Sequence, residues 1–356
     1  DVYKRQSVDG ELLGIGHYQN GSISVRIFSF TTSSIDPDFW QDKLQRAYDY
    51  RQSLGLTDDP KTNCYRLVHA EGDGLPGLVI DIYGETAVLQ CHSIGMYEER
   101  AHLVSALQSI YGDRLQCIYN KSADTLPSQY GSNIQNGPLW GTGSSQLVRE
   151  NGFQFEVNWE EGQKTGFFLD QRENRDLLRR YVAGKKVLNS FAYSGGFSIY
   201  ALGAGATLVD SVDISSKATN LLDANIQHNN FSKLEHHTHT SDVLKFLRET
   251  EDTYDVMVVD PPAFAKNLKK RHNAVQGYKR LNAMALQKIR PGGVLFTFSC
   301  SQVVGSQLFY DTIVAAALEA KRRVRVMHRL SQPPDHPVNF FHPEGSYLKG
   351  LVLFVE

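Results

Sequence analysis

Hydrophobic residues in the second half of the chain recur in a pattern typical of alternating β-strands and α-helices. Short apolar runs at residues 187–188, 207–212, 255–259 and 294–298 are separated by segments with helical spacing, and residues 307–321 form a further such segment. Strands and helices that alternate at this length predict an α/β fold, with a mostly parallel sheet covered on both faces. In such sheets, ligands bind beyond the carboxyl ends of the strands.

The first 160 residues follow a different pattern, with short alternating strands and fewer helices. Asp36 and Pro37 are expected to begin an amphipathic helix, as its N-cap and its first residue. Residues 78–83 and 86–91 are predicted to form a hairpin, whereas the polar stretch at residues 127–145 is expected to be a loop. We therefore predict a small β-rich domain with a linker helix (1–55), an α+β domain (56–160) and a Rossmann-like domain (161–356).

The composition is that of an ordinary soluble protein, with 41% hydrophobic and 21% charged residues among 356. The formal charge of −2 provides no overall basic field for a nucleic acid, although a local patch can still bind one. The four cysteines form no CxxC pair, so neither a metal site nor a disulfide framework is expected. With no signal peptide and no apolar run of membrane length, these features predict a cytoplasmic protein without a membrane partner.

A glycine turn between a predicted strand and a predicted helix is the first candidate binding site. Gly195 and Gly196 let backbone amides approach a ligand, although any tight turn of this type uses glycine. Asp213 ends the next predicted strand, where a carboxylate can accept hydrogen bonds from two ribose hydroxyls. The turn lacks the three-glycine dinucleotide spacing and has no Lys-Ser/Thr phosphate grip. This predicts a nucleoside cofactor without a phosphate chain, above all S-adenosylmethionine (SAM).

Asn189, Asp213, Asp242, Asp260 and Cys300 all fall at predicted strand ends, and hence at the expected ligand edge of the sheet. Asp242 would lie near the adenine amino group. It is equally well interpreted as the N-cap of the helix that follows, and both can hold.

The loop Asp260-Pro261-Pro262-Ala263-Phe264 is the more informative motif. Two prolines after a buried strand stiffen a loop without amide donors, so that Asp260 can face the edge of a planar base. Prolines also commonly end strands. Methyltransferases that act on exocyclic amines use a similar Asp/Asn-Pro-Pro followed at once by an aromatic residue, but here Ala263 intervenes.

Cys300 lies between two serines after the strand at residues 294–298. A pyrimidine C5 accepts a methyl group only after a thiolate has added to C6, so a cysteine at the ligand edge favours this chemistry. A lone cysteine in a strand is more often a small buried hydrophobe, but its position beside Asp260 favours the nucleophile. No activator of the thiol can be identified from the sequence.

Two basic clusters, at residues 266–272 with 279–280 and at 321–325, are solvated surfaces by default. The first directly follows the Pro-Pro loop, where it would serve as a flexible arm that grips phosphate.

At these motifs the chain resembles the bacterial 23S rRNA cytosine-5 methyltransferases of the RlmI type. The resemblance covers nearly the whole chain. It rests on YRLVHAEGDGLPGLVID (65–81), EGQKTGFFLDQRENR (161–175), FAYSGGF (191–197), VDIS (212–215), DPPAFAK (260–266), FSCS (298–301) and PEGSYLKG (343–350).

The resemblance implies a PUA domain, a small α+β middle domain and a Rossmann-like SAM-dependent catalytic domain. It implies that Cys300 is the nucleophile and Asp260 its acidic partner. It places SAM at Ser190, Phe191, Ala192, Tyr193, Gly195, Gly196, Asp213 and Asp242, with Phe167, Asp170 and Arg172 lining the pocket. The base-binding residues would be Pro261, Pro262, Phe264 and Lys266. The implied partner is 23S rRNA or a large-subunit assembly particle, and a homodimer is compatible with the sequence.

The chain departs from the family pattern in two places. Family members usually carry an acidic residue where Asn189 stands. The neutral Asn189 gives less electrostatic help to the methionine ammonium than that acidic residue would. The family also has a basic stretch before the position of residue 7, so the PUA domain is expected to be incomplete here.

Three functions follow, and they differ in what Cys300 does. The first is formation of 5-methylcytosine in 23S rRNA through a covalent adduct between Cys300 and C6. In the second, the Asp-Pro-Pro loop holds an exocyclic amine for methylation and Cys300 is structural. The third is an RNA-binding module without catalysis.

Overall fold

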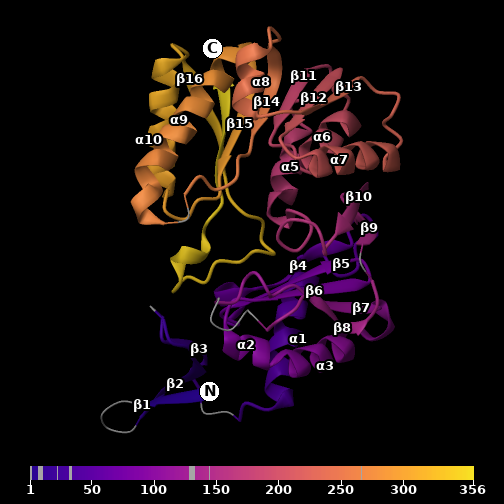
Figure 1. Ribbon diagram of the computed structural model, residues 1–356, viewed down its shortest axis with the longest axis vertical. Helices are drawn as coiled ribbons and strands as arrows, with labels where there is room; N and C mark the ends of the chain where they lie inside the picture. Colours follow the sequence, from indigo (N-terminus) through magenta and orange to yellow (C-terminus); the bar gives the residue numbers. More distant parts are fainter. Residues whose placement is uncertain are drawn as a thin grey trace. The chain divides into compact units, whose positions relative to one another are not determined.

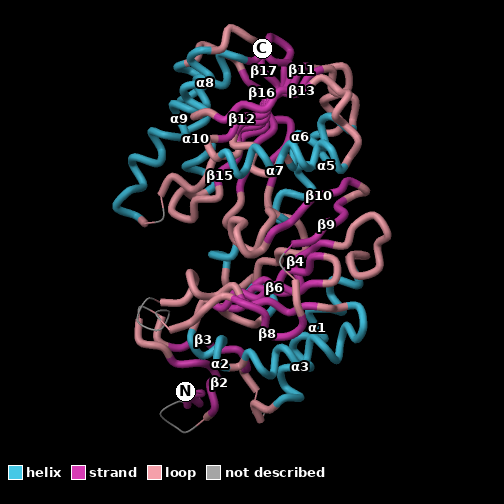
Figure 2. Tube along the Cα trace, turned by 45° about the vertical axis from the view of Figure 1, so that its right-hand side comes forward, coloured by secondary structure: helices cyan, strands magenta, loops and turns pink. Residues whose placement is uncertain are grey.

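The computed structural model describes residues 2–6, 11–21, 23–31, 34–127, 133–143, 145–265 and 267–356 (Figures 1 and 2). The chain forms two compact units. Unit 1 comprises Asp1–Gly152, Glu156–Leu169 and Pro334–Gly345, and unit 2 comprises Phe153–Phe155, Asp170–Pro333 and Ser346–Glu356. The predicted separation of residues 1–55 from 56–160 stays a prediction.

Unit 2 is built on a seven-stranded sheet with the order β13-β12-β11-β14-β15-β17-β16. Its strands are β11 (Lys186–Ser190), β12 (Leu208–Asp213), β13 (His236–Thr240), β14 (Tyr254–Val259), β15 (Ile289–Ser299), β16 (Val324–Leu330) and β17 (Lys349–Val355). The first five strands in this order are parallel, and β17 is antiparallel to both of its neighbours. The mostly parallel sheet predicted from the sequence is confirmed.

Helices cover both faces of this sheet (Figure 1). They are α5 (Arg172–Leu178), α6 (Gly196–Gly203), α7 (Ser216–His228), α8 (Val243–Glu249), α9 (Arg271–Lys288) and α10 (Ser306–Glu319). Leu188, Met257 and Leu295 point to one face, where they form a core with apolar residues of α8, α9 and α10. On the other face, Phe197 of α6 packs on Phe298, with ring centroids 5.7 Å apart.

Unit 1 contains smaller sheets. A five-stranded sheet joins β4 (Cys64–His69), β5 (Leu78–Tyr83), β6 (Thr86–Cys91), β7 (Cys117–Asn120) and β8 (Gly137–Gly141), and a three-stranded sheet joins β1 (Val2–Gln6), β2 (Leu12–Tyr18) and β3 (Val25–Ser29). Strand β9 (Ser145–Glu150) pairs with β10 (Phe153–Asn158), whose first three residues are assigned to unit 2. The helices are α1 (Pro37–Ser53), α2 (Ile94–Glu98) and α3 (Arg100–Tyr111). Short 3-10 helices occur in unit 1 at Ala70–Asp73, Gly112–Arg114 and Pro343–Gly345, in unit 2 at Leu268–Lys270, and at Leu169–Gln171, where the chain passes from unit 1 to unit 2.

The predicted start of α1 and the predicted hairpin are both confirmed. Asp36 caps α1 by accepting a hydrogen bond from the Phe39 amide at 3.0 Å, and the hairpin strands are β5 and β6. The stretch expected to be a loop contains β8, which is largely exposed and therefore lacks an apolar signal. No helix in the described ranges is long and apolar enough to cross a membrane.

Candidate cofactor and active site

The turn between β11 and α6 uses backbone conformations that most residues avoid. Phe191 and Tyr193 have φ angles of +61° and +46°, and Gly195 has +83°. Residues other than glycine rarely adopt a positive φ because it strains the backbone. Such a strained conformation persists only where the surrounding structure fixes it. Here the Ala192 amide donates to the Val212 carbonyl at 3.0 Å, which ties the turn to β12. The turn lies at the carboxyl end of β11, where the strand order reverses between β11 and β14.

Asp213, the last residue of β12, holds this turn with its carboxylate. One oxygen accepts from the Tyr193 amide and the other from the Ser215 amide, each at 2.9 Å. Each oxygen keeps a further lone pair, so the carboxylate can also accept ribose hydroxyls. The next residue, Ile214, exposes 72% of its surface and offers an apolar face for a base. The sequence analysis did not identify Ile214, although an apolar residue directly after a strand-ending carboxylate was visible in VDIS.

The hydroxyl of Ser190 indicates that a polar ligand fits at this edge of the sheet. Its side chain is fully buried, and its hydroxyl has no hydrogen-bond partner in the part of the chain that the structure describes. Leaving a buried hydroxyl unpaired costs about 1–3 kcal/mol. A polar group of a bound cofactor would relieve this cost. Ser190, the strained turn and Asp213 together fit a nucleoside cofactor such as SAM.

Asn189 does not stand at the ligand edge, and this expectation is wrong. Strand β11 continues through Ser190, so Asn189 lies inside the strand and is buried. Its side-chain amide donates to the Ser198 hydroxyl on α6 at 2.8 Å, and Ser198 in turn bonds Ser211 at 2.7 Å. A neutral amide satisfies this buried hydrogen-bond chain without burying a charge.

Asp242 is the N-cap of α8, as one of its two interpretations predicted. Its carboxylate accepts from the Lys245 amide at 2.8 Å, and the residue is exposed. Contact with the adenine amino group stays a prediction.

The motif at residues 161–175 is divided between the two units. Phe167 lies in unit 1, where it is buried and its amide donates to the Tyr83 hydroxyl at 3.3 Å. In unit 2, Asp170 accepts a 2.6 Å hydrogen bond from the Tyr347 hydroxyl, and Arg172 is buried at the start of α5. The cofactor-binding roles of Phe167, Asp170 and Arg172 stay predictions.

Gln171 was missed by the sequence analysis. Its side-chain amide donates to the Asp260 carboxylate at 3.0 Å, and Asn174 donates to the Gln171 oxygen at 2.6 Å. Gln171 therefore orients Asp260. The only signal for it was its place within a motif that otherwise pointed to the cofactor.

Asp260 and Cys300 follow neighbouring parallel strands, in which Val259 pairs with Thr297. Their loops therefore begin at the same edge of the sheet. The Ser301 hydroxyl ties the two loops together by donating to the Ala265 carbonyl at 2.8 Å. Cys300 is half-buried, whereas the other three cysteines are buried. The structure thus brings the two predicted catalytic residues together.

The rest of the Pro-Pro loop packs against α9. Pro261 is buried and Pro262 is exposed, while the Phe264 ring lies 4.6 Å from that of Tyr278. Burial raises the pKa of Tyr278 to about 12, and the charges of Cys300 and Asp260 act in the same direction. The Phe264 ring is therefore held by the helix, and its contact with a base stays a prediction.

Lys266 lies outside the described residues, and the basic segment after it is not the flexible arm that we expected. Residues Leu268–Lys270 form a 3-10 helix, and α9 begins at Arg271. The side chains of this segment are exposed, so the cations remain available on an ordered element.

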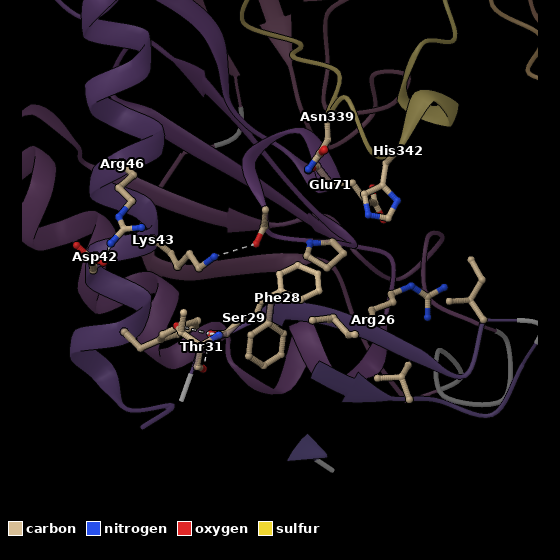
Figure 3. Close-up of a pocket in the computed structure, with 17 residues that line it drawn as sticks. Arg26, Phe28, Ser29, Thr31, Asp42, Lys43, Arg46, Glu71, Asn339 and His342 are labelled. Carbon is tan, nitrogen blue, oxygen red and sulfur yellow. Dashed lines mark hydrogen bonds and ion pairs between the residues drawn. The ribbon is translucent and has the colours of Figure 1, made fainter. Parts of the chain in front are cut away.

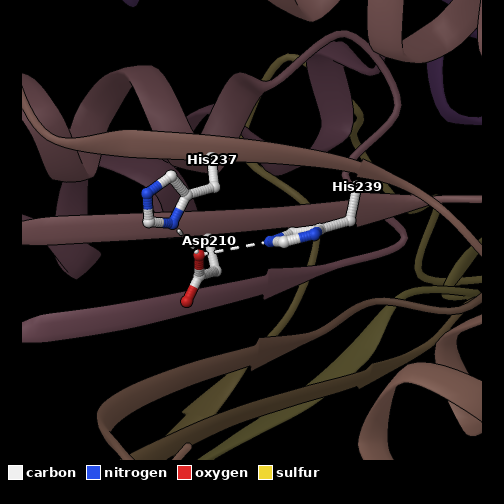
Figure 4. Close-up of side chains that lie close together, drawn as sticks. All are labelled: Asp210, His237 and His239. Atoms are coloured by element: carbon white, nitrogen blue, oxygen red, sulfur yellow. Dashed lines mark hydrogen bonds and ion pairs between the residues drawn. The ribbon is translucent and has the colours of Figure 1, made fainter. Parts of the chain in front are cut away.

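Asp210, His237 and His239 could hold a metal ion, because their ligand atoms all lie within 4.8 Å of one another (Figure 4). One oxygen of the buried Asp210 already contacts His237 Nδ1 at 2.8 Å and His239 Nε2 at 3.3 Å. The other accepts from the Tyr254 hydroxyl at 2.9 Å. These hydrogen bonds satisfy the carboxylate on their own, and they tie the edge strand β13 to β12.

The sheet order and the site define a class: an α/β domain that binds a nucleoside cofactor at the point where its strand order reverses. Comparison with known proteins agrees. Residues 138–352 match the family model described as S-adenosylmethionine-dependent methyltransferase. A SAM-dependent methyltransferase from Streptococcus mutans has a similar structure, with a TM-score of 0.86 and 25% identity over 99% of this chain and 91% of that one. A second methyltransferase structure, with the same scores, was solved with SAH.

Among sequence relatives, the ribosomal RNA large subunit methyltransferase I of Shewanella denitrificans is 41% identical, over 97% of this chain and 87% of its own. That of Escherichia coli is 40% identical, over 96% of this chain and 87% of its own. The chain therefore belongs to the SAM-dependent methyltransferases, in the family of the ribosomal RNA large subunit methyltransferases I. The family resemblance and the SAM cofactor inferred from the sequence are confirmed.

Proposed function

We propose that the protein methylates C5 of a cytosine in large-subunit rRNA, which is 23S rRNA in bacteria. The observation that carries this proposal is the joining of the Asp260 and Cys300 loops through Ser301 and Ala265, at the same sheet edge as the cofactor turn. The relatives' names support large-subunit rRNA as the substrate class.

The chemistry follows from what each side chain can do. A cytosine flipped out of the RNA would enter edge-on against Asp260, whose carboxylate accepts from the exocyclic amino group and supports N3 through a shared proton. The Cys300 thiolate adds to C6, and the electrons displaced from the C5–C6 bond make C5 nucleophilic. SAM supplies the electrophilic methyl group that C5 takes. Loss of the C5 proton to a base then restores the double bond and releases the Cys300 thiolate. Gln171 keeps the Asp260 carboxylate in place during these steps.

Covalent trapping tests this proposal. RNA with 5-fluorocytosine at the target position should form a stable adduct in the presence of SAM, because fluorine cannot leave C5 as a proton does. The wild type should show a slow-migrating complex on denaturing gels, and Cys300→Ala should not. Cys117→Ala removes a buried thiol of unit 1 and is the matched control. Equal trapping by Cys300→Ala would show that Cys300 is not the nucleophile.

The buried Pro261 beside Asp260 is compatible with a second candidate function, namely methylation of an exocyclic amine. Mass mapping of nucleosides after incubation separates the two, since they yield 5-methylcytosine or an N-methylated base. Full activity of Cys300→Ala would favour the amine. Calorimetric titration without any SAM binding would remove both functions and leave the RNA-binding module.

Unit 1 offers a surface that suits RNA. A cavity of about 650 Å³ is lined by Arg26, Lys43 and Arg46, and also by Glu71 and by Asp42, which pairs with Arg46 (Figure 3). The neighbouring Phe340 and Phe341 expose 93% and 87% of their surfaces. Cations beside exposed aromatic rings are the combination that binds phosphates and stacks unpaired bases. We assign this surface a share of the RNA contacts.

A further inference from the structure

Lys349 is a buried lysine at the Cys300 loop that the sequence analysis passed over. It is the first residue of β17, and its antiparallel partner on β15 is Ser299, the residue before Cys300. Only 5% of Lys349 is exposed. The placement of β17 next to β15 therefore brings a cation beside the residue that precedes the candidate nucleophile.

The contacts of Lys349 are directed at the Cys300 loop. Its ammonium donates to the Ser301 carbonyl at 2.7 Å and to the Val304 carbonyl at 2.8 Å. These two hydrogen bonds fix the backbone on the carboxyl side of Cys300. Within the described residues, no aspartate or glutamate pairs with Lys349.

A buried cation without a carboxylate partner is unfavourable unless another anion lies near it. Burial lowers the pKa of Lys349 to about 8, and the charge of Cys300 acts in the opposite direction. At neutral pH the ammonium is therefore still present. Cys300 is the group that opposes this lowering, and when it is a thiolate the attraction between the two charges stabilises both.

We propose that Lys349 is a positioning residue for Cys300, which holds the residue 300–304 loop and stabilises the Cys300 thiolate. This inference rests on the proposed role of Cys300 as nucleophile. Within the described ranges, Asp260 and Cys300 both raise the pKa of Tyr278, so the three groups are neighbours; a negative charge on Asp260 disfavours the thiolate, and Tyr278 stays neutral at pH 7. Lys349 thus supplies the activator that the sequence did not identify.

Thiol alkylation of the resting protein tests the inference. Iodoacetamide should report on Cys300, because the other three cysteines are buried, and Cys300→Ala provides the blank. The rate is measured from pH 6 to 10. For Lys349→Met we expect the midpoint of the pH–rate curve to rise and the rate at pH 7 to fall roughly tenfold, as for the loss of a nearby opposite charge. Lys349→Arg should restore much of the rate. The plateau at high pH should not change.

The plateau and one control separate charge from loop support. Lys185→Met removes an exposed cation at the amino end of β11 and should keep the wild-type midpoint. An unchanged midpoint in Lys349→Met, or an equal shift in Lys185→Met, would overturn the inference. If Lys349→Met does not fold, Lys349→Gln and Lys349→Arg are compared in its place.

Failure of the proposed function would look different. If Cys300→Ala still traps 5-fluorocytosine RNA while Lys349→Met shifts the alkylation midpoint, the ion pair exists and the nucleophile has been misassigned. If trapping requires Cys300 and the midpoint does not move, the proposed function stands and the role of Lys349 is wrong.

Discussion

Among single residues, Lys349 gives the fold a pH dependence that can be measured without substrate. Its pKa is lowered by burial from the ordinary 10.5 to about 8, so between these values the unfolded chain holds a proton that the folded chain has released. Stability should therefore rise with pH across this window, by up to roughly 3 kcal/mol. Urea unfolding at pH 7.5 and 10 should show this gain in the wild type relative to Lys349→Met. A constant difference between the two proteins would contradict it.

Asp213 allows a second test at the residue scale. Its carboxylate holds the Tyr193 and Ser215 amides and is expected to accept the ribose hydroxyls. Hydrogen bonds to a charged group are worth about 1.5–3 kcal/mol, so Asp213→Asn should weaken SAM binding roughly tenfold or more in calorimetric titration. Asp242→Asn is the matched control, because an amide oxygen can still cap α8. Equal losses in both variants would argue against a special role for Asp213.

The site residues found from the sequence share one property. Each is a polar or reactive residue that follows a predicted strand. Asp213, Asp260 and Cys300 follow apolar runs, and parallel strands bring such ends together. Gln171 and Lys349 act through contacts with residues 89 and 48 positions away in the chain. No local pattern encodes such contacts. Lys349 in particular depends on β17 entering the sheet beside β15.

At the scale of elements, the turn from β11 to α6 contains a glycine whose backbone conformation and close packing can be tested separately. Gly195 and Gly205 both have positive φ, at +83° and +86°, but a Cβ on Gly195 would come within 2.7 Å of Leu222 while Gly205 faces open space. Alanine at either position should cost about 1–2 kcal/mol for the backbone conformation. Gly195→Ala should cost a further 1–3 kcal/mol or so for the clash, and it should weaken SAM binding.

Urea unfolding and calorimetric titration of the two alanine variants make this comparison. If Gly195→Ala matches Gly205→Ala in stability and binds SAM like the wild type, then the turn does not shape the cofactor site.

Elements with a regular spacing of hydrophobic residues could be predicted from the sequence. Elements held by polar contacts could not. The strand β13 has the sequence HHTHT, and it is tied to its neighbour by the carboxylate of Asp210 rather than by apolar side chains. The helix α9 begins at Arg271, in a run of exposed basic residues that was expected to be a flexible arm. In both cases hydrophobic periodicity, on which the prediction depended, is weak.

For the whole molecule, a formal net charge of −2 does not show where positive and negative side chains gather on the surface. The cations around the unit 1 cavity belong to β3 and α1, while the cofactor turn belongs to unit 2. If unit 1 contributes to RNA binding, affinity for RNA and affinity for SAM should be separable by mutation. The sequence allowed a local basic patch and indicated one at residues 266–272, but it could not indicate the unit 1 surface, because Arg26 and Lys43 come together only through folding.

Arg26→Glu and Phe341→Ala should therefore weaken binding of an rRNA fragment and leave SAM titration unchanged. Loss of one phosphate contact should lower the slope of log affinity against log salt by about 1 in Arg26→Glu. Loss of a stacked base should cost about 1–3 kcal/mol in Phe341→Ala, with the salt slope unchanged. Lys185→Glu makes the same charge change at the amino end of β11, away from the ligand edge, and is the matched control. If Lys185→Glu weakens RNA binding as much as Arg26→Glu does, the effect is one of net charge and the unit 1 surface is not an RNA site.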